Sequence, residues 1–344
     1  MARGIRIVGG GLAGLSLGVA LQSRGVPVEL WEAGALPRHR VCGEFISGVR
    51  PATLEFLGIA DLLADAHRHE TVVWYRGDGH RCYRARLPRP ALGISRHALD
   101  ERIAGRLEDL GGRVRREERW RGSLDEPGSV LGTGRKAERG SPWIGLKVHA
   151  EAPREHREGD LALFLGEGGY LGMSAVEGGW WNACGLFRKR PGVRASKEAL
   201  LGRYAEASGI EALAGDRFPA VRAGSGVGVS ALSFALPTPS RDGLLRLGDA
   251  WGLIPPFTGN GMSIAFESAE IAVLPLLRWA AGEEEWARVV TAIEEAHQRR
   301  FRRRFQVARI LHGWLLSPRR QRWLLAGART GLLPFRRLFV WTHD

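Results

Sequence analysis

A strand, a glycine-rich turn, a helix and a second strand follow one another in residues 5–34, and this unit constrains the fold more than any other feature of the chain. The β-branched run at 5–8 leads into a Gly-x-Gly-x-x-Gly motif at 9–14, and the apolar stretch after it predicts a helix. A second strand is predicted at 28–32. In this order of elements, such glycines are typical of a dinucleotide-binding βαβ unit.

Each glycine of the motif has a physical role in a unit of this kind. Gly9 permits the tight turn, Gly11 lets the backbone approach a pyrophosphate, and Gly14 lets helix and strand pack closely. The free N–H groups and the positive dipole end of the helix favour the phosphates. Glu32 is placed to accept a ribose hydroxyl, and its charge would repel a 2′-phosphate. The motif alone does not distinguish NAD from FAD.

A second glycine-rich turn lies within residues 245–269. A strand is predicted to end before Asp249, two prolines stiffen the loop after it, and Gly259-Asn260-Gly261 opens a long helix. Asp249 can bind a chain of sugar-like hydroxyls. The bare backbone at the helix start suits a flavin ring, because the ring gains negative charge near N1 and C2=O when it is reduced.

Together the two segments resemble the flavoprotein family that joins geranylgeranyl reductases to aromatic hydroxylases of the p-hydroxybenzoate hydroxylase type. The run GDAWGLIPPFTGNGM at 248–262 resembles the second FAD motif of that family. Cys42-Gly43-Glu44 is similar to the element after the first motif in the reductase-like branch. Residues 94–100 resemble a helix start whose arginine, here Arg96, lies near the flavin's phosphate and ribityl chain. The resemblance covers residues 5–285 or so and implies a bound FAD.

By this resemblance, the loop at 40–47 borders the flavin. The residues predicted to contact the cofactor are Gly9, Gly11, Ala13, Gly14, Glu32, Ala33, Arg40, Cys42, Gly43, Arg96, Gly248, Asp249, Pro256, Gly259, Asn260, Gly261 and Met262. The candidates for a proton donor to the substrate are, in falling order, Glu44, Cys42 and Tyr170. Two alternatives stay open: Cys42 as a small buried hydrophobe, and Glu44 as a capping or surface carboxylate.

The predicted fold is α/β, with a Rossmann-type FAD-binding domain, an inserted strand-rich substrate domain and a helical C-terminal segment. The FAD-binding domain is expected to be three-layered around a parallel sheet. Strands are predicted in the substrate domain at 143–149, 161–165 and 181–187. The assigned ranges are 1–70, 95–140 and 241–290 for the FAD-binding domain, 71–94 and 141–240 for the substrate domain, and 291–344 for the C-terminal segment.

The chain departs from the family's patterns at three places. Tyr170 is the one residue that matches the Tyr-x-Trp-x-Phe-Pro of prenyl reductases, and the halogenase pattern Trp-x-Trp-x-Ile-Pro is missing. Thr133-Gly134-Arg135 stands near the point where the family carries Asp-Gly. No second Gly-x-Gly-x-x-Gly unit follows a strand, so NAD(P)H is expected at most as a transient reductant, and a separate electron donor is equally compatible.

The positive charge of the chain is concentrated in its last residues. The formal net charge is +13, and residues 297–344 contain twelve arginines against one acid, Asp344. Apolar residues recur there at helical spacing, and Ser317-Pro318 predicts a new helix start. A helical cap with a solvated arginine face is the plainer interpretation, and contact with a membrane surface is the second. Nucleic acid is not expected, because no recognised binding module accompanies the charge.

Three scattered cysteines and the lack of Cys/His pairs at zinc spacing predict neither disulfides nor a structural metal. With no apolar run long enough to span a bilayer and no signal peptide expected, we predict a cytoplasmic enzyme, peripheral to the inner face of the membrane if the basic segment binds there. The oligomeric state is left open.

The main functional hypothesis is flavin hydride transfer to a carbon–carbon double bond of a hydrophobic small molecule, as in geranylgeranyl reductases. The alternative is an FAD-dependent monooxygenase, in which reduced flavin reacts with oxygen. A hypothesis of another class is a non-catalytic or electron-relay flavoprotein that docks through its basic segment.

Overall fold

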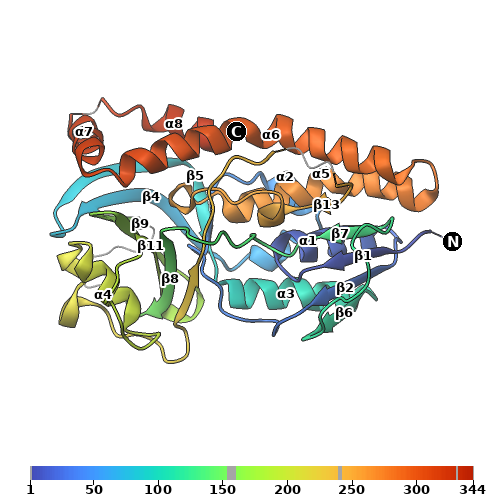
Figure 1. Cartoon of the computed structure of the whole chain (residues 1–344), viewed down its shortest axis with the longest axis horizontal. Coiled ribbons are helices and arrows are strands. Elements are labelled where there is room, and N and C mark those ends of the chain that lie inside the picture. The colour runs from blue at the N-terminus through green and yellow to red at the C-terminus, as the bar shows by residue number, and fades with distance from the viewer. Residues whose placement is uncertain (1, 153–159, 239–241, 331, 344) are drawn as a thin grey trace.

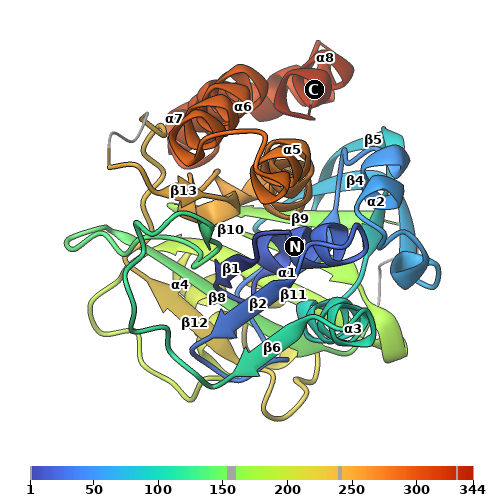
Figure 2. The same cartoon turned by 90° about the vertical axis from the view of Figure 1, so that its right-hand side faces the viewer.

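The computed structural model describes residues 2–152, 160–238, 242–330 and 332–343. It has two β-sheets that lie side by side, and a layer of C-terminal helices extends over both (Figure 1 and Figure 2). No helix among the described residues combines the length and the apolar character that crossing a membrane requires.

The first sheet is parallel, with the strand order β13-β7-β1-β2-β6. Its strands are β1 (Ile5–Val8), β2 (Val28–Glu32), β6 (Arg113–Arg116), β7 (Ser129–Leu131) and β13 (Leu245–Arg246). Helices α1 (Leu12–Gln22), α3 (Arg96–Asp109) and α5 (Gly261–Ala281) pack with it in one apolar core, and the short α2 (Pro51–Phe56) lies against α5. The strand–turn–helix–strand unit and the long helix after the second glycine turn are therefore confirmed.

The second sheet is mixed, with the strand order β12-β8-β11-β10-β9-β4-β5-β3. Its strands are β3 (Phe45–Ile46), β4 (His67–Arg76), β5 (Arg81–Gly93), β8 (Trp143–Ala150), β9 (Asp160–Gly166), β10 (Gly169–Ala175), β11 (Trp181–Arg188) and β12 (Val227–Ser230). Helix α4 (Leu200–Ala207) packs on one face of it. The strands predicted at 143–149, 161–165 and 181–187 are thus found as β8, β9 and β11.

One detail of the second sheet differs from expectation, and another concerns its two adjacent tryptophans. Strand β3 and the first residues of β4 pair with β5, although their residues were assigned to the FAD-binding domain. A short local pattern does not tell which sheet a strand will join. Trp181 is buried in the core on the α4 side and the ring of Trp180 lies under Arg222, so neither tryptophan lines the large cavity described below.

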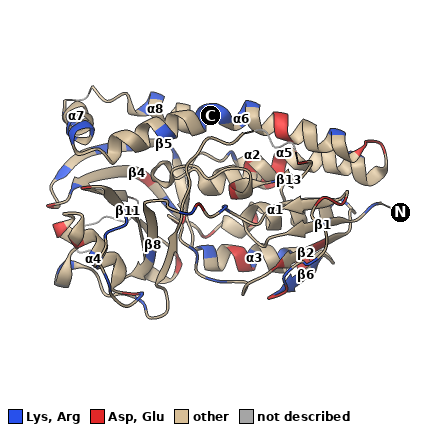
Figure 3. Cartoon of the chain, viewed as in Figure 1, with Lys and Arg blue, Asp and Glu red and all other residues tan. Residues whose placement is uncertain are grey.

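The C-terminal layer consists of α6 (Trp286–Leu315), α7 (Pro318–Arg329) and α8 (Phe335–His343). Helix α6 packs on α5, and the buried Arg304 makes a two-pronged ion pair with Glu267 at 3.0 and 2.9 Å. Helices α7 and α8 lie against β5. Arginines are spread along this layer (Figure 3). The helix predicted to start at Ser317-Pro318 is confirmed, and Gly331 and Asp344 of the predicted segment lie outside the described residues.

Candidate functional site

A cavity of about 1180 Å³ is enclosed by residues of both sheets and of the C-terminal helices. Three neighbouring parallel strands, β1, β7 and β13, end beside it. Gly9 and Gly132, which directly follow β1 and β7, line its wall, and so do Leu247 and Gly248 after β13. Open α/β sheets bind ligands beyond the carboxyl ends of their strands. The cavity therefore lies where a sheet of this kind places its cofactor.

The structure brings most of the predicted cofactor residues to this one cavity. Those that line it are Gly9, Gly11, Ala13, Glu32, Ala33, Arg40, Cys42, Gly43, Arg96, Gly248, Asp249, Pro256, Gly259, Gly261 and Met262. Gly14 does not line the cavity. It lies where α1 packs closely against the preceding turn, and a Cβ added there would lie 2.3 Å from the carbonyl oxygen of Gly9. Asn260 does not line the cavity either, since its amide donates to the carbonyl of Thr342 at 2.7 Å.

Two helix N-termini are open toward the cavity, and a bound dinucleotide needs such open helix starts for its phosphates and its ring. Gly11 precedes α1, and a Cβ added to it would meet nothing nearer than the Gly132 carbonyl oxygen at 3.8 Å. Gly261 begins α5, and its Cβ would meet nothing within 4 Å. Free space beside bare backbone N–H groups suits anionic or polar ligand atoms. The residues present therefore fit a pyrophosphate at α1 and the electron-accepting edge of a flavin at α5.

Phe45 is a cavity residue that the sequence analysis did not single out. Its ring lies beside two predicted cofactor glycines, since added Cβ atoms would come within 2.9 Å of it from Gly43 and 2.1 Å from Gly259. Both glycines therefore make room for an aromatic ring of the chain itself. Nothing in the local pattern around residue 45 indicates this packing.

Glu32 is held in place by the turn that it faces. Its Oε2 accepts from the backbone N–H of Gly10 at 2.9 Å, and its Oε1 accepts from Gly34 at the same distance. Arg38 and Arg40 approach the same carboxylate at 3.2 and 3.5 Å. A carboxylate has about four acceptor positions. The two N–H groups and the two arginines account for these positions, so a ribose hydroxyl would have to take the place of an arginine contact, such as the longer one from Arg40.

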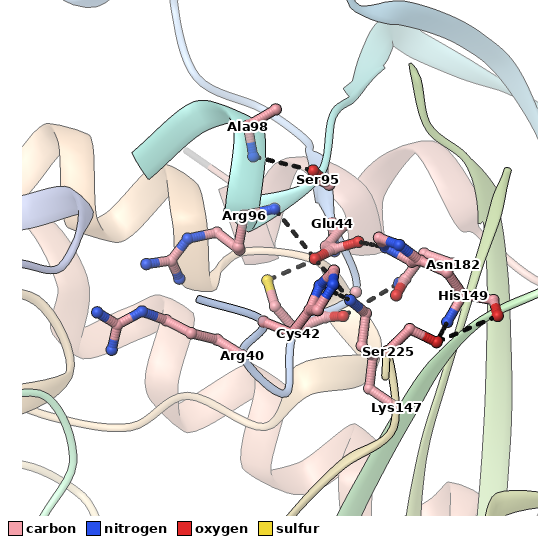
Figure 4. Close-up of polar contacts among 12 residues, drawn as sticks. Arg40, Cys42, Glu44, Ser95, Arg96, Ala98, Lys147, His149, Asn182 and Ser225 are labelled. Carbon is pink, nitrogen blue, oxygen red and sulfur yellow. Dashed lines mark hydrogen bonds and ion pairs between the residues drawn. The ribbon is translucent and has the colours of Figure 1, made fainter. Parts of the chain in front are cut away.

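Two arginines and a fully buried aspartate form a fixed cationic wall. The guanidinium of Arg96 donates two hydrogen bonds of 2.9 Å to the carboxylate of Asp100, and Arg40 donates to the same carboxylate at 3.1 Å. Burial disfavours the charge of Arg96, but Asp100 outweighs burial and the pKa of Arg96 is raised. In Figure 4 both guanidinium groups extend to the side away from Glu44. The wall suits the negative charge of a phosphate.

Asp249 also lines the cavity, and its pKa is raised. Burial raises the pKa of Asp249 to about 6, while the nearby Arg96 and Arg135 pull it down. Since the usual value is 3.8, the folded chain binds this proton more tightly than the unfolded chain. The ionised carboxylate therefore costs stability, and the cost grows as the pH rises from about 4 to about 6 and is constant above that.

We expect Asp249→Asn to stabilise the cofactor-free protein more at pH 7.0 than at pH 4.5, because the substitution removes a cost that is present in full only above pH 6 or so. The measurement is the free energy of unfolding by urea at both pH values. Glu295→Gln, which changes an exposed acid in an i,i+4 pair on α6, is the control and should show no such difference. An equal effect of Asp249→Asn at both pH values would contradict the raised pKa.

Glu44 is the centre of a buried cluster rather than a cavity residue. Its Oε1 lies 3.1 Å from Nζ of Lys147 and accepts from the backbone N–H of Arg96 at 3.0 Å. Its Oε2 lies 2.6 Å from Nε2 of His149 (Figure 4). Glu44 and Lys147 are both fully buried, and Glu44 has a left-handed backbone with φ 53°. Two strand residues and a helix N-terminus therefore anchor the loop at 40–47.

This geometry does not support Glu44 as the leading proton donor. Burial alone would raise the pKa of Glu44, but the hydrogen bond from His149 and the charge of Lys147 outweigh it, and the pKa is lowered. The carboxylate is thus held ionised, and Glu44 does not line the cavity. It also differs from the alternative of a surface carboxylate, because it is fully buried. Its role in this structure is to hold the loop.

Cys42 and Tyr170, the other proton-donor candidates, do line the cavity. Burial raises the pKa of the Cys42 thiol, and it raises the pKa of the Tyr170 phenol well above its usual value. Both groups therefore keep their protons at neutral pH. Cys184, beside them on β11, also lines the cavity, and burial raises its pKa in the same way.

Lys147, His149 and His39 are the polar residues that the sequence analysis missed. The Nδ1 of His39 lies 3.2 Å from Nζ of Lys147, and burial lowers the pKa of His39, which lines the cavity, to about 4. A signal was present: Lys147 and His149 are two apart on a strand that is otherwise apolar, so both side chains point to the same face. Their common partner, Glu44, lies about a hundred residues earlier in the sequence.

The far end of the cavity is apolar. It is lined by side chains of the second sheet, such as Trp74, Leu163 and Leu186, and by side chains of the C-terminal helices, such as Leu324 and Phe339. Among the described residues, no three His, Cys, Asp or Glu side chains are grouped so as to hold a metal ion. The cavity therefore combines a polar, glycine-lined end with an apolar end.

No protein-family model matches the chain, and no curated protein sequence matches it either. Solved structures do match it along its length. HpxO of Klebsiella pneumoniae, complexed with FAD and uric acid, has a TM-score of 0.75 and 16% sequence identity, over 99% of this chain and 96% of its own. The p-nitrophenol 4-monooxygenase PnpA of Pseudomonas putida has a TM-score of 0.75 and 14% identity, over 100% and 98% of the two chains.

A triple mutant of the flavin-dependent brominase Bmp2 has a TM-score of 0.72 and 15% identity, over 99% of this chain and 95% of its own. At such identities the likeness concerns the fold. The α/β fold predicted from the two glycine motifs is confirmed by these matches. The chain has the fold of solved proteins that include a monooxygenase, a flavin-dependent brominase and a protein solved with bound FAD.

Proposed function

We propose that the protein is an FAD-dependent oxidoreductase that acts as a monooxygenase on a hydrophobic small molecule. The observation that carries the proposal is the pair of open helix N-termini, at Gly11 and Gly261, on one cavity with an apolar far end. The cavity exceeds the roughly 300–1,000 Å³ of an ordinary ligand pocket, which supports a site for cofactor and substrate together.

In this proposal each end of the cofactor has its own residues. The N–H groups at the start of α1 and the wall of Arg40 and Arg96 hold the pyrophosphate, and Glu32 accepts a ribose hydroxyl. Asp249 accepts hydroxyls of the ribityl chain, and the start of α5 faces the flavin ring. The bound flavin supplies electrons and, when reduced, reactivity toward oxygen.

The fold matches favour the monooxygenase over the double-bond reductase that was the main hypothesis from sequence. One matching structure is described as a 4-monooxygenase and another as a flavin-dependent brominase. Leu315, Leu324 and Phe339 wall the cavity with apolar side chains, and such a wall excludes water from the reacting atoms. Hydride transfer to a carbon–carbon double bond remains the second candidate, with Cys42 and Tyr170 as proton donors.

The electron donor and the cellular setting are also part of the proposal. NAD(P)H binding transiently at the cavity, or a separate donor protein, would reduce the flavin. The protein would work in the cytoplasm. An electron-relay protein without its own substrate is a weaker candidate, because a relay needs no large apolar chamber.

Labelled oxygen distinguishes the two reactions. In a monooxygenase, one atom of O₂ enters the substrate, the other leaves as water, and the flavin provides two electrons. FAD-loaded protein, NADH and a panel of apolar aromatic compounds should therefore give, under ¹⁸O₂, a product that carries one ¹⁸O atom by mass spectrometry. A product that gains two hydrogens without oxygen, also under argon, would assign the reductase reaction instead.

A further inference from the structure

The outer side of the C-terminal layer is unusual for a protein surface in water. Several large apolar side chains are exposed there, and Trp323 and Leu332 are exposed to 75% and 79%. The full set on this layer is Ile310, Trp314, Trp323, Leu332, Val340 and Trp341. Only four other large apolar side chains are exposed in the rest of the described chain. Several large exposed apolar groups on one layer of helices indicate an interaction site.

The same helices also carry exposed arginines. The exposed arginines of the layer that have no carboxylate within ion-pair distance among the described residues are Arg302, Arg303, Arg309, Arg319, Arg320, Arg322, Arg329, Arg336 and Arg337. In Figure 3 the basic residues of α6, α7 and α8 are blue. The guanidinium of Arg303 lies 5.4 Å from the ring of Trp341, which joins α6 to α8. We call this surface of arginines and apolar side chains the outer face.

The layer is one helix thick, and its inner side lines the cavity. Trp314 is exposed while Leu315 lines the cavity, and Trp323 is exposed while Leu324 lines it. Phe335 and Phe339 of α8 also line the cavity. Helices α6, α7 and α8 thus separate the outer face from the apolar end of the proposed site.

We infer that the outer face docks onto an anionic lipid bilayer. Tryptophan and arginine side chains favour the membrane–water interface. Apolar side chains such as Leu332 are stabilised when they leave water and enter it. A second copy of the chain would bring one arginine-rich face against another, and like charges oppose that contact. Nucleic acid would meet the arginines, but it offers no apolar phase for Ile310 or Val340.

Docking gives an apolar substrate a short route, because a molecule dissolved in the bilayer would lie next to the helices that wall the cavity. That consequence rests on the proposed function, whereas docking itself does not. Vesicle binding and flavin content therefore test the two ideas separately.

The experiment is sedimentation of the full-length protein with vesicles of phosphatidylcholine, with and without phosphatidylglycerol. We expect binding only to the anionic vesicles. Replacing Arg319, Arg320 and Arg322 with glutamine should weaken binding to the anionic vesicles about 100-fold. Each arginine near an anionic surface contributes about 1 kcal/mol to binding. Replacing the exposed Arg194, Arg203 and Arg217 with glutamine removes the same charge in the α4 region and should leave binding unchanged.

Trp323→Ser should also weaken vesicle binding, whereas Leu274→Ser, at a 59% exposed residue of α5, should not. All variants should keep the flavin content of the unchanged protein, since the substituted residues are exposed and do not line the cavity. Vesicle binding that is absent, or that the outer-face variants leave unchanged, would overturn the inference. So would a dimer that Trp323→Ser converts to a monomer, or tighter binding to a polynucleotide than to anionic vesicles.

Discussion

Replacing Gly11 with valine is expected to leave the protein folded and to abolish its retention of FAD. The backbone of Gly11 has φ −91° and ψ 174°, which any L-residue can adopt, and its added Cβ would have open space. That space is where the proposed pyrophosphate must approach the start of α1. We expect the affinity for FAD to fall at least about 100-fold, equivalent to about 3 kcal/mol, as measured by titration of the cofactor-free protein.

Two other glycines provide matched controls. Gly105→Ala on α3 has nothing within 4 Å of its new Cβ and does not line the cavity, so FAD binding should be unchanged. Gly14→Ala would press its Cβ to 2.3 Å from the Gly9 carbonyl oxygen and should lower stability as well as binding. A stable Gly11→Val protein with unchanged affinity for FAD would contradict the assignment of the pyrophosphate site.

Replacing Glu44 with alanine is expected to lower the free energy of unfolding by about 3–5 kcal/mol. The change leaves Lys147, which is fully buried, without the carboxylate that stabilises its charge. It also leaves His149 and the N–H of Arg96 without an acceptor. Unfolding in guanidinium chloride measures the loss, and the flavin content of the purified variant reports whether the loop at 40–47 still forms its part of the site.

The pair Glu44 and Lys147 also allows a double-mutant cycle. Lys147→Met removes the buried cation with little change of volume, so the double variant Glu44→Ala/Lys147→Met should lose less stability than the sum of the single changes. Glu70→Ala, in an exposed ion pair with Arg86, should cost less than about 1 kcal/mol. Additive effects of the two substitutions in the cluster would contradict the contact between them.

The parts of the fold that follow from local signals could be predicted from the sequence. The first strand, turn, helix and strand depend on glycines and apolar residues within thirty positions or so, and the helix after Gly261 depends on its glycine turn. The same glycines indicated the polar end of the cavity, because backbone that lacks a Cβ is needed wherever a helix start meets a phosphate or a flavin.

The parts that depend on distant contacts could not be predicted in the same way. The acidity of Glu44 is decided by Lys147 and His149, which reach it only through the pairing of strands in the second sheet. The apolar end of the cavity is completed by α7 and α8, which come far later in the chain than the strands that they face. Helical spacing in the basic segment indicated helices, but it did not indicate which of their sides would face a ligand.

If the starts of α1 and α5 converge on one FAD molecule, the cofactor-free protein should take up FAD again. Purified full-length protein is stripped of flavin, incubated with FAD, separated from free cofactor and then denatured to release what it bound. We expect one FAD per chain, released intact because it is held without a covalent bond. A folded protein that retains no FAD after this treatment would show that the two helix starts do not form a flavin site.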